Sequence, residues 1–197
     1  MNVPMILQAL APVVRAFQEL GISYHIRGSV ASSAYGIARA TLDVDLVADL
    51  PEHRIGPLVE RLQGAYYIDE DRVREAVKGR SSFNIIHLTS MIKVDVFVLR
   101  DRSHDRVAFS RARVQCLDEA SPEHEYRVAS PEDVIIAKLD WYLQGGGVSE
   151  RQWNDILGVL KVQRGTLDMP YLQQWAGQLG LSELLRQAMQ DAGYPAL

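Results

Sequence analysis

Two aspartates separated by one residue are the clearest chemical feature of the sequence. Asp43 and Asp45 lie in the segment Leu42-Asp43-Val44-Asp45-Leu46. Because successive side chains of a strand point to opposite faces, the two carboxylates would share one face, about 7 Å apart. Carboxylate oxygens are ligands that hard cations such as Mg²⁺ prefer. The alternative is a half-exposed strand whose polar side faces water, and the pair alone does not decide between the two.

A third aspartate, Asp95, lies in the apolar segment Val94-Asp95-Val96-Phe97-Val98-Leu99. If this segment is a strand, the face that carries Asp95 continues with Phe97 and Leu99. A carboxylate on an apolar face is costly unless it is paired, hydrogen-bonded or bound to a metal. Asp95 therefore either joins the first two aspartates around divalent metal or forms an ion pair with a nearby Arg or Lys.

The segment Arg27-Gly28-Ser29-Val30-Ala31 falls where a predicted strand meets a predicted helix. Glycine lets a phosphate approach the backbone closely, and Ser29 offers a hydroxyl. The free N–H groups and the positive dipole end of the helix favour an anion. An ordinary tight turn is the alternative. The segment matches neither a Walker loop nor a dinucleotide-binding fingerprint, so the sequence does not support those classes.

The elements that must position these residues follow from the spacing of apolar residues. Strands are predicted over 22–27, 41–48, 83–88 and 91–99, with a tight turn near Thr89-Ser90 and further short strands over 107–117 and 125–128. Helices are predicted over 5–20, 30–35 and 52–62; residues 69–78 are a short polar helix or a loop, and 100–105 a charged loop.

The character of the sequence changes near residue 129. Ser130 is a typical N-cap residue and Pro131 a typical first helical residue. Helices are predicted from there to about 143, and over 149–163, 169–179 and 182–191. We therefore expect two domains, a mixed α/β core over 1–129 and a helical region over 130–197.

The order of these motifs, a Gly-Ser turn, then Arg39-x-Thr41-x-Asp43-x-Asp45, then a distant Asp95, resembles the DNA-polymerase-beta-like nucleotidyltransferase superfamily. The likeness is strongest to its AbiEii-type and minimal nucleotidyltransferase branch and covers roughly residues 20 to 100. It implies an α/β (α+β) fold, a mixed twisted sheet flanked by helices, followed by a C-terminal helical bundle. Residues 64–80 match no motif of the family.

The resemblance also implies a site. Two Mg²⁺ (or Mn²⁺) ions would be bound by Asp43, Asp45 and Asp95, and Asp95 could accept the proton of the acceptor. The NTP would be held by Gly28, Ser29, Arg39, Thr41 and Lys138.

Two C-terminal features resemble the family more weakly. Lys138 follows the motif Ser130-Pro131-Glu132-Asp133 and shares a helical stripe with Val134 and Trp141. Its amine either extends past the core to solvent or points into a cleft. Arg151 and Asp155 are spaced for an ion pair on a helix surface.

The implied reaction is transfer of a nucleoside monophosphate from an NTP to an acceptor hydroxyl. The branch suggests a toxin of a toxin–antitoxin or phage-defence system that modifies tRNA or a protein, with a cognate antitoxin as a partner. A small-molecule acceptor such as an aminoglycoside is the alternative within the enzyme class. A non-catalytic module that binds a nucleotide or a partner is the alternative outside it.

Charge and cysteine content bound the remaining classes. The chain has 197 residues and net charge −4, but the segment from Arg72 to Arg113 carries +6, leaving −10 for the rest. This segment is either an RNA-facing surface or a set of solvated arginines. Cys116 is the only cysteine, which favours a reducing, cytoplasmic setting. No apolar run approaches the ~20 residues of a membrane span, so no membrane partner is expected.

Overall fold

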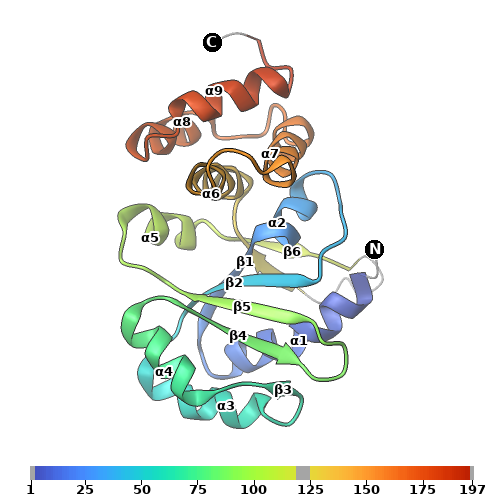
Figure 1. Cartoon of the computed structure of the whole chain (residues 1–197), viewed down its shortest axis with the longest axis vertical. Coiled ribbons are helices and arrows are strands. Elements are labelled where there is room, and N and C mark those ends of the chain that lie inside the picture. Colours follow the sequence, from blue (N-terminus) through green and yellow to red (C-terminus); the bar gives the residue numbers. More distant parts are fainter. Residues whose placement is uncertain (1–2, 119–124, 196–197) are drawn as a thin grey trace. The chain divides into compact units, whose positions relative to one another are not determined.

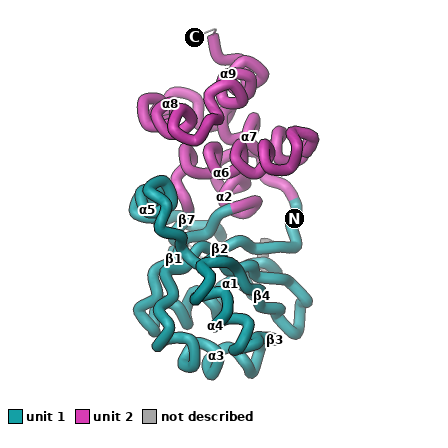
Figure 2. The backbone as a smooth tube through the Cα atoms, turned by 60° about the vertical axis from the view of Figure 1, so that its left-hand side comes forward, with its two compact units in different colours: residues 1–27, 40–128 teal, residues 28–39, 129–197 magenta. Residues whose placement is uncertain are grey.

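The computed structural model describes residues 3–118 and 125–195 (Figure 1). Contacts divide the chain into two compact units, coloured separately in Figure 2. The sheet unit comprises Met1–Arg27 and Ala40–Val128, and the helical unit comprises Gly28–Arg39 and Ala129–Leu197. The short segment that follows the first strand therefore groups with the C-terminal helices. The predicted domains 1–129 and 130–197 stay a prediction. None of the described helices combines the length and apolarity that a membrane crossing requires.

The sheet unit contains one mixed sheet, with strand order β3-β4-β5-β2-β1-β7-β6. The pairs β2–β5 and β1–β7 are parallel, and the other neighbours are antiparallel. The predicted α/β class with a mixed sheet flanked by helices is confirmed. The strands are β1 Ser23–Arg27, β2 Asp43–Asp49, β3 Tyr66–Tyr67, β4 Ser82–His87, β5 Lys93–Val98, β6 Arg113–Cys116 and β7 Glu125–Val128.

One face of this sheet is apolar because every second residue of its central strands is aliphatic or aromatic. Ile26, Leu46 and Val96 are fully buried there. The helices α1 (Val3–Glu19) and α3 (Ile55–Leu62) pack together, with α1 against β1 and β2, while α4 (Glu70–Gly79) packs on β4 (Figure 1). The short 3-10 helix η1 (Glu52–Arg54) leads into α3. Burying one face leaves the polar residues of the same strands on the other.

The predicted strand over 107–117 and the predicted charged loop over 100–105 differ from the structure. Residues 103–110 form helix α5 (Ser103–Ser110), so the strand predicted over 107–117 is confined to β6 and the predicted charged loop is shorter. His104 and Ala108, four residues apart, are the buried residues of α5, which is helical spacing. Residues 69–78, left open between helix and loop, form α4, whose N-cap Asp69 accepts a hydrogen bond from the Arg72 amide. The two-residue strand β3 is not predicted by its sequence.

The helical unit consists of α2 and the C-terminal helices. Ser130 caps α6 as predicted, accepting a hydrogen bond from the Asp133 amide, with Pro131 in the first turn. Helix α2 packs against both α6 and α7. Gly36, just after α2, lies so close to α7 that an added Cβ would sit 2.8 Å from the Val159 amide nitrogen. The helices are α2 Gly28–Tyr35, α6 Pro131–Gln144, α7 Glu150–Val162, α8 Met169–Gln178 and α9 Ser182–Asp191.

Candidate functional site

The three predicted aspartates all lie in the sheet unit, on neighbouring parallel strands. Asp45 of β2 is directly opposite Asp95 of β5, and Asp43 is opposite Lys93. Neighbouring strands are about 4.8 Å apart, so side chains at opposed positions are in reach of one another. Asp43 is exposed, while Asp45 and Asp95 are partly exposed. The sheet thus brings the three carboxylates onto one accessible face, as the sequence pattern predicts.

Lys93 is the immediate partner of Asp95. Its ammonium lies 2.8 Å from Asp95 Oδ2. The hydrogen bond to Asp95 raises the pKa of Lys93 above its usual value, and the charges of Asp95, Asp43 and Asp45 act in the same direction, against partial burial. The ion pair that was one of the two explanations of Asp95 is therefore present. The sequence signal for it is simple, because residues two apart in a strand share a face.

A row of polar side chains continues across this face. Arg27 at the end of β1 is paired in register with Asp45, and Asn84 of β4 with Asp95. The Arg27 guanidinium also lies over the Phe97 ring, 5.0 Å from its centroid. Two cations, Arg27 and Lys93, thus accompany the three carboxylates. Neither was among the predicted site residues. Arg27 could not be found from spacing within one segment, because its place depends on the register between β1 and β2.

The carboxylates fit the donor chemistry of Mg²⁺ or Mn²⁺. Within residues 3–118 and 125–195, no three His, Cys, Asp or Glu side chains gather into a group that could hold a metal ion. Mg²⁺ does not need such a cage, since proteins commonly hold it with one or two carboxylates together with substrate phosphates and water. Asp43 and Asp45 supply suitable oxygens on one face, and Asp95 supplies a third that is engaged with Lys93.

Thr41 has a local role at the entrance to β2. Its hydroxyl donates to the Asp43 carbonyl at 3.2 Å and lies 3.4 Å from the Asp43 amide. The side chain is buried. These bonds fix the backbone where the strand begins and therefore help to set the direction of the Asp43 side chain.

The predicted phosphate turn lies in the helical unit. Gly28 opens α2 with φ 65°, a left-handed conformation that side chains disfavour. Ser29 is partly exposed in the first turn, and its carbonyl accepts from the Ser32 hydroxyl at 3.1 Å. The Arg39 guanidinium donates to the Ser29 hydroxyl. The turn thus combines a helix N-terminus with a cationic side chain, an arrangement suited to an anion.

Arg39 and Lys138 converge on one carboxylate, that of Asp155 in α7. Arg39 donates two hydrogen bonds, Nε to Oδ1 at 2.7 Å and Nη2 to Oδ2 at 2.8 Å. Lys138 Nζ lies 2.8 Å from Oδ2. Burial alone would raise the pKa of Asp155, but the hydrogen bonds and charges of Arg39 and Lys138 outweigh it and lower that pKa. Two cations on one buried carboxylate leave a net positive charge beside Ser29.

This arrangement corrects two expectations. Lys138 does not extend past the core to solvent, since its side chain is buried and paired with Asp155. Asp155 is not half of an ion pair with Arg151 on the helix surface, since its side chain is only 4% exposed and binds Arg39 and Lys138. The sequence spacing thus singled out Asp155 but predicted the wrong partner for it.

The basic segment from Arg72 to Arg113 forms many of its ion pairs with acids that lie inside it, so these pairs leave most of its net charge of +6 in place. Several of its arginines contact a carboxylate: Arg72 with Glu75, Arg74 with Glu70, Arg80 and Arg106 with Asp101, and Arg102 with Asp105. Both interpretations of the segment, an RNA-facing surface and a set of solvated arginines, stay open.

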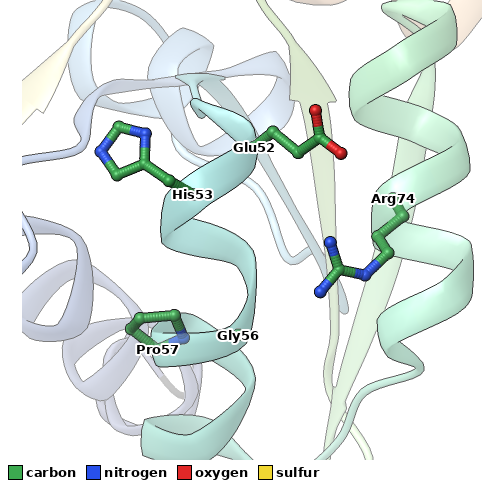
Figure 3. A pocket seen from close by; sticks show the side chains of 5 residues that line it. All are labelled: Glu52, His53, Gly56, Pro57 and Arg74. Atoms are coloured by element: carbon green, nitrogen blue, oxygen red, sulfur yellow. The ribbon is translucent and has the colours of Figure 1, made fainter.

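One hollow of the sheet unit, about 570 Å³ in volume, is lined by none of the predicted site residues. Glu52 and Arg74 extend toward each other across it from η1 and α4 (Figure 3). It is lined by Glu52, His53, Gly56, Pro57 and Arg74.

Comparisons with known proteins agree on the fold. The structure resembles ANT(2'')-Ia in complex with adenylyl-2''-tobramycin, with TM-score 0.56 and 14% identity over 89% of this chain and 97% of that chain. It also resembles an antigenic nucleotidyltransferase-like protein from Paracoccidioides brasiliensis, with TM-score 0.54 and 16% identity over 96% of this chain and 92% of that one. No protein-family model and no curated protein matches the sequence. The chain therefore has the fold of nucleotidyltransferases.

Proposed function

We propose that the protein is a metal-dependent nucleotidyltransferase that transfers a nucleoside monophosphate from an NTP to an acceptor hydroxyl. One observation carries the proposal: on a nucleotidyltransferase fold, Asp45 lies directly opposite Asp95 on neighbouring parallel strands, with Asp43 on the same face. Carboxylates so close together repel one another, and divalent cations relieve that repulsion.

The sheet unit supplies the metal ligands in this proposal. Asp43 and Asp45 hold Mg²⁺ or Mn²⁺, and Asp95 completes the set. When bound, such ions place positive charge against the phosphates and lower the pKa of an acceptor hydroxyl. Thr41 supports the set indirectly, because its hydrogen bonds fix the backbone of Asp43.

The helical unit supplies the phosphate contacts. Gly28 and Ser29 offer the N-terminus of α2 and a hydroxyl to the β and γ phosphates. Arg39 and Lys138 add positive charge that exceeds the charge of Asp155. The family resemblance implies that these two residues contact the nucleotide, and their shared partner Asp155 supports a common role for both cations.

The proposed reaction forms one bond and breaks one. The acceptor oxygen bonds to the α-phosphorus, and the bond from that phosphorus to the oxygen bridging to the β-phosphate breaks. Pyrophosphate leaves with the electron pair of that bond. The acceptor proton passes to the carboxylate of Asp95, which acts as general base.

The proposal also concerns which molecule carries the acceptor hydroxyl. The sequence resemblance to the AbiEii-type branch supports tRNA or a protein, and with it a toxin that has an antitoxin partner. The likeness to ANT(2'')-Ia, a structure that contains adenylyl-2''-tobramycin, supports a small-molecule hydroxyl.

The direct test incubates the pure, folded protein with each α-labelled NTP and Mg²⁺ in three arms: total tRNA, cell-extract protein and an aminoglycoside. We expect label in one arm only, and none when Mg²⁺ is chelated. Binding of NTP without labelled acceptor would instead indicate the non-catalytic module. A protein that neither binds an NTP nor labels an acceptor would overturn the proposal.

The toxin role has its own test. Induced expression should slow growth, and Asp43→Asn should remove this effect at equal protein level. Growth arrest that persists with Asp43→Asn would separate toxicity from nucleotide transfer.

A further inference from the structure

A cation of the protein itself already lies among the three carboxylates. The Lys93 ammonium is 2.8 Å from Asp95 Oδ2, and Lys93 is opposite Asp43 in the β2–β5 register. The side chains of Lys93 and Asp95 are 41% and 22% exposed. The ammonium thus binds an oxygen that the proposed function assigns to a metal ion.

Folding does not explain this pair. Ion pairs exposed to this degree contribute little to stability, because water screens the charges and two side chains lose freedom. Lys93 is opposite Asp43, and Asp95, which it binds, is opposite Asp45, so the ammonium lies beside the whole set of carboxylates. The positive charge of Lys93 weakens the attraction of these carboxylates for a second cation.

Lys93 is better suited to leave this place than Arg27, the other cation on the face. A lysine ammonium is a compact charge on a flexible stem, whereas the planar guanidinium of Arg27 also rests on the Phe97 ring. Lys93 can therefore move away from Asp95 without breaking an aromatic contact.

We propose that Lys93 is a built-in competitor of the divalent cation, which neutralises Asp95 until metal binds and leaves Asp95 when it does. This inference rests on the proposed function. It makes Lys93 a positioning residue that sets the metal concentration at which the site fills, because the two cations require the same oxygens and repel each other.

The test measures Mn²⁺ alone, by the loss of the free Mn²⁺ signal in electron paramagnetic resonance. Lys93→Met keeps most of the apolar stem and removes the charge, so we expect it to bind Mn²⁺ about tenfold more tightly than the unaltered chain. Lys93→Arg keeps a cation at this position, so its Mn²⁺ affinity should be close to that of the unaltered chain. Lys78→Met is the matched control, since it removes the same charge from an exposed position of α4 and should leave Mn²⁺ affinity unchanged.

The outcomes separate the inference from the proposed function. If Asp45→Asn abolishes Mn²⁺ binding while Lys93→Met binds as the unaltered chain does, the metal site stands and the competitor role of Lys93 is wrong. Tighter binding by both Lys93→Met and Lys78→Met would reduce the effect to net charge and also overturn it. If neither the unaltered chain nor Lys93→Met binds Mn²⁺, both the inference and the metal site fall.

Discussion

Arg39 and Asp155, 116 residues apart in the chain, form a two-pronged ion pair within the helical unit. The same carboxylate binds Lys138, which is buried between α6 and α7. One acidic side chain therefore orients both cations that we assign to nucleotide phosphates. Asp155 is buried in the helical unit, where removing one partner of an ion pair lowers the stability of the protein.

Asp155→Asn should destabilise the protein by about 3 kcal/mol, because it leaves the Lys138 ammonium buried without its counter-charge. Urea unfolding followed by tryptophan fluorescence measures this loss. The double variant Asp155→Asn/Lys138→Met should recover part of it, since it also removes the buried ammonium that Asp155 binds. Glu183→Gln, which removes an exposed ion pair with Arg186, is the control and should unfold as the unaltered chain does. A loss no larger than that of the control would contradict the structural role of Asp155.

Gly36→Ala should destabilise the packing of α2 on α7 by about 1–3 kcal/mol, because the added methyl group would meet backbone atoms that cannot rotate away. The three nearest atoms lie at 2.8–2.9 Å and belong to the backbones of Val159, Gly158 and Ser32. Gly56→Ala is the matched control. It lies in α3 with open space around it, so the same change should stabilise by about 0.5 kcal/mol. Equal effects at both positions would argue against the close approach at Gly36.

His25 should make the protein sensitive to mild acid. Burial, reinforced by the charges of Arg27 and Arg127, lowers the pKa of His25 from 6.5 to about 3. Between these values the unfolded chain binds more protons than the folded one, so stability falls as pH decreases from 6.5 toward 3. At pH 4.5 the expected loss is about 3 kcal/mol relative to neutral pH.

Urea unfolding at pH 7 and pH 4.5 checks this prediction. His25→Gln should show a smaller difference between the two pH values by that amount. His53→Gln, at an exposed position, should keep the original difference. If His25→Gln leaves the acid sensitivity unchanged, the loss at low pH comes from other groups.

Local patterns were sufficient for much of the fold. The alternation around Asp43 and Asp45 predicts a strand with both carboxylates on one face, and the register of β2 confirms the shared face. Ser130 and Pro131 predict the start of α6, which begins there. Helix α5 was missed because Val107 and Phe109, two residues apart, fit a strand as well as a helix. The burial of His104, which favours the helix, is known only from the folded chain.

Contacts between distant segments could not be predicted in the same way. The spacing within α7 predicts an ion pair between Asp155 and Arg151, but Asp155 binds Arg39 instead. Spacing along one helix contains no information about a residue as distant in the chain as Arg39. Lys93 shares a strand face with Asp95 and could have been found from the sequence. Its position opposite Asp43, however, depends on the pairing of β2 with β5, and many registers are compatible with two apolar strands.

Asp45→Asn should lower nucleotidyl transfer by about 10²- to 10³-fold, since it removes charge at the centre of the carboxylate set while keeping the shape of the side chain. Asp49→Asn is the matched control on the same strand and face. Asp49 is exposed and paired with Arg106 at 3.4 Å, so its loss should change the rate by no more than about twofold. Initial rates with a saturating acceptor measure both, and equal unfolding midpoints confirm that the variants fold. Equal losses at the two positions would mean that the net charge of the strand matters, and not the position opposite Asp95.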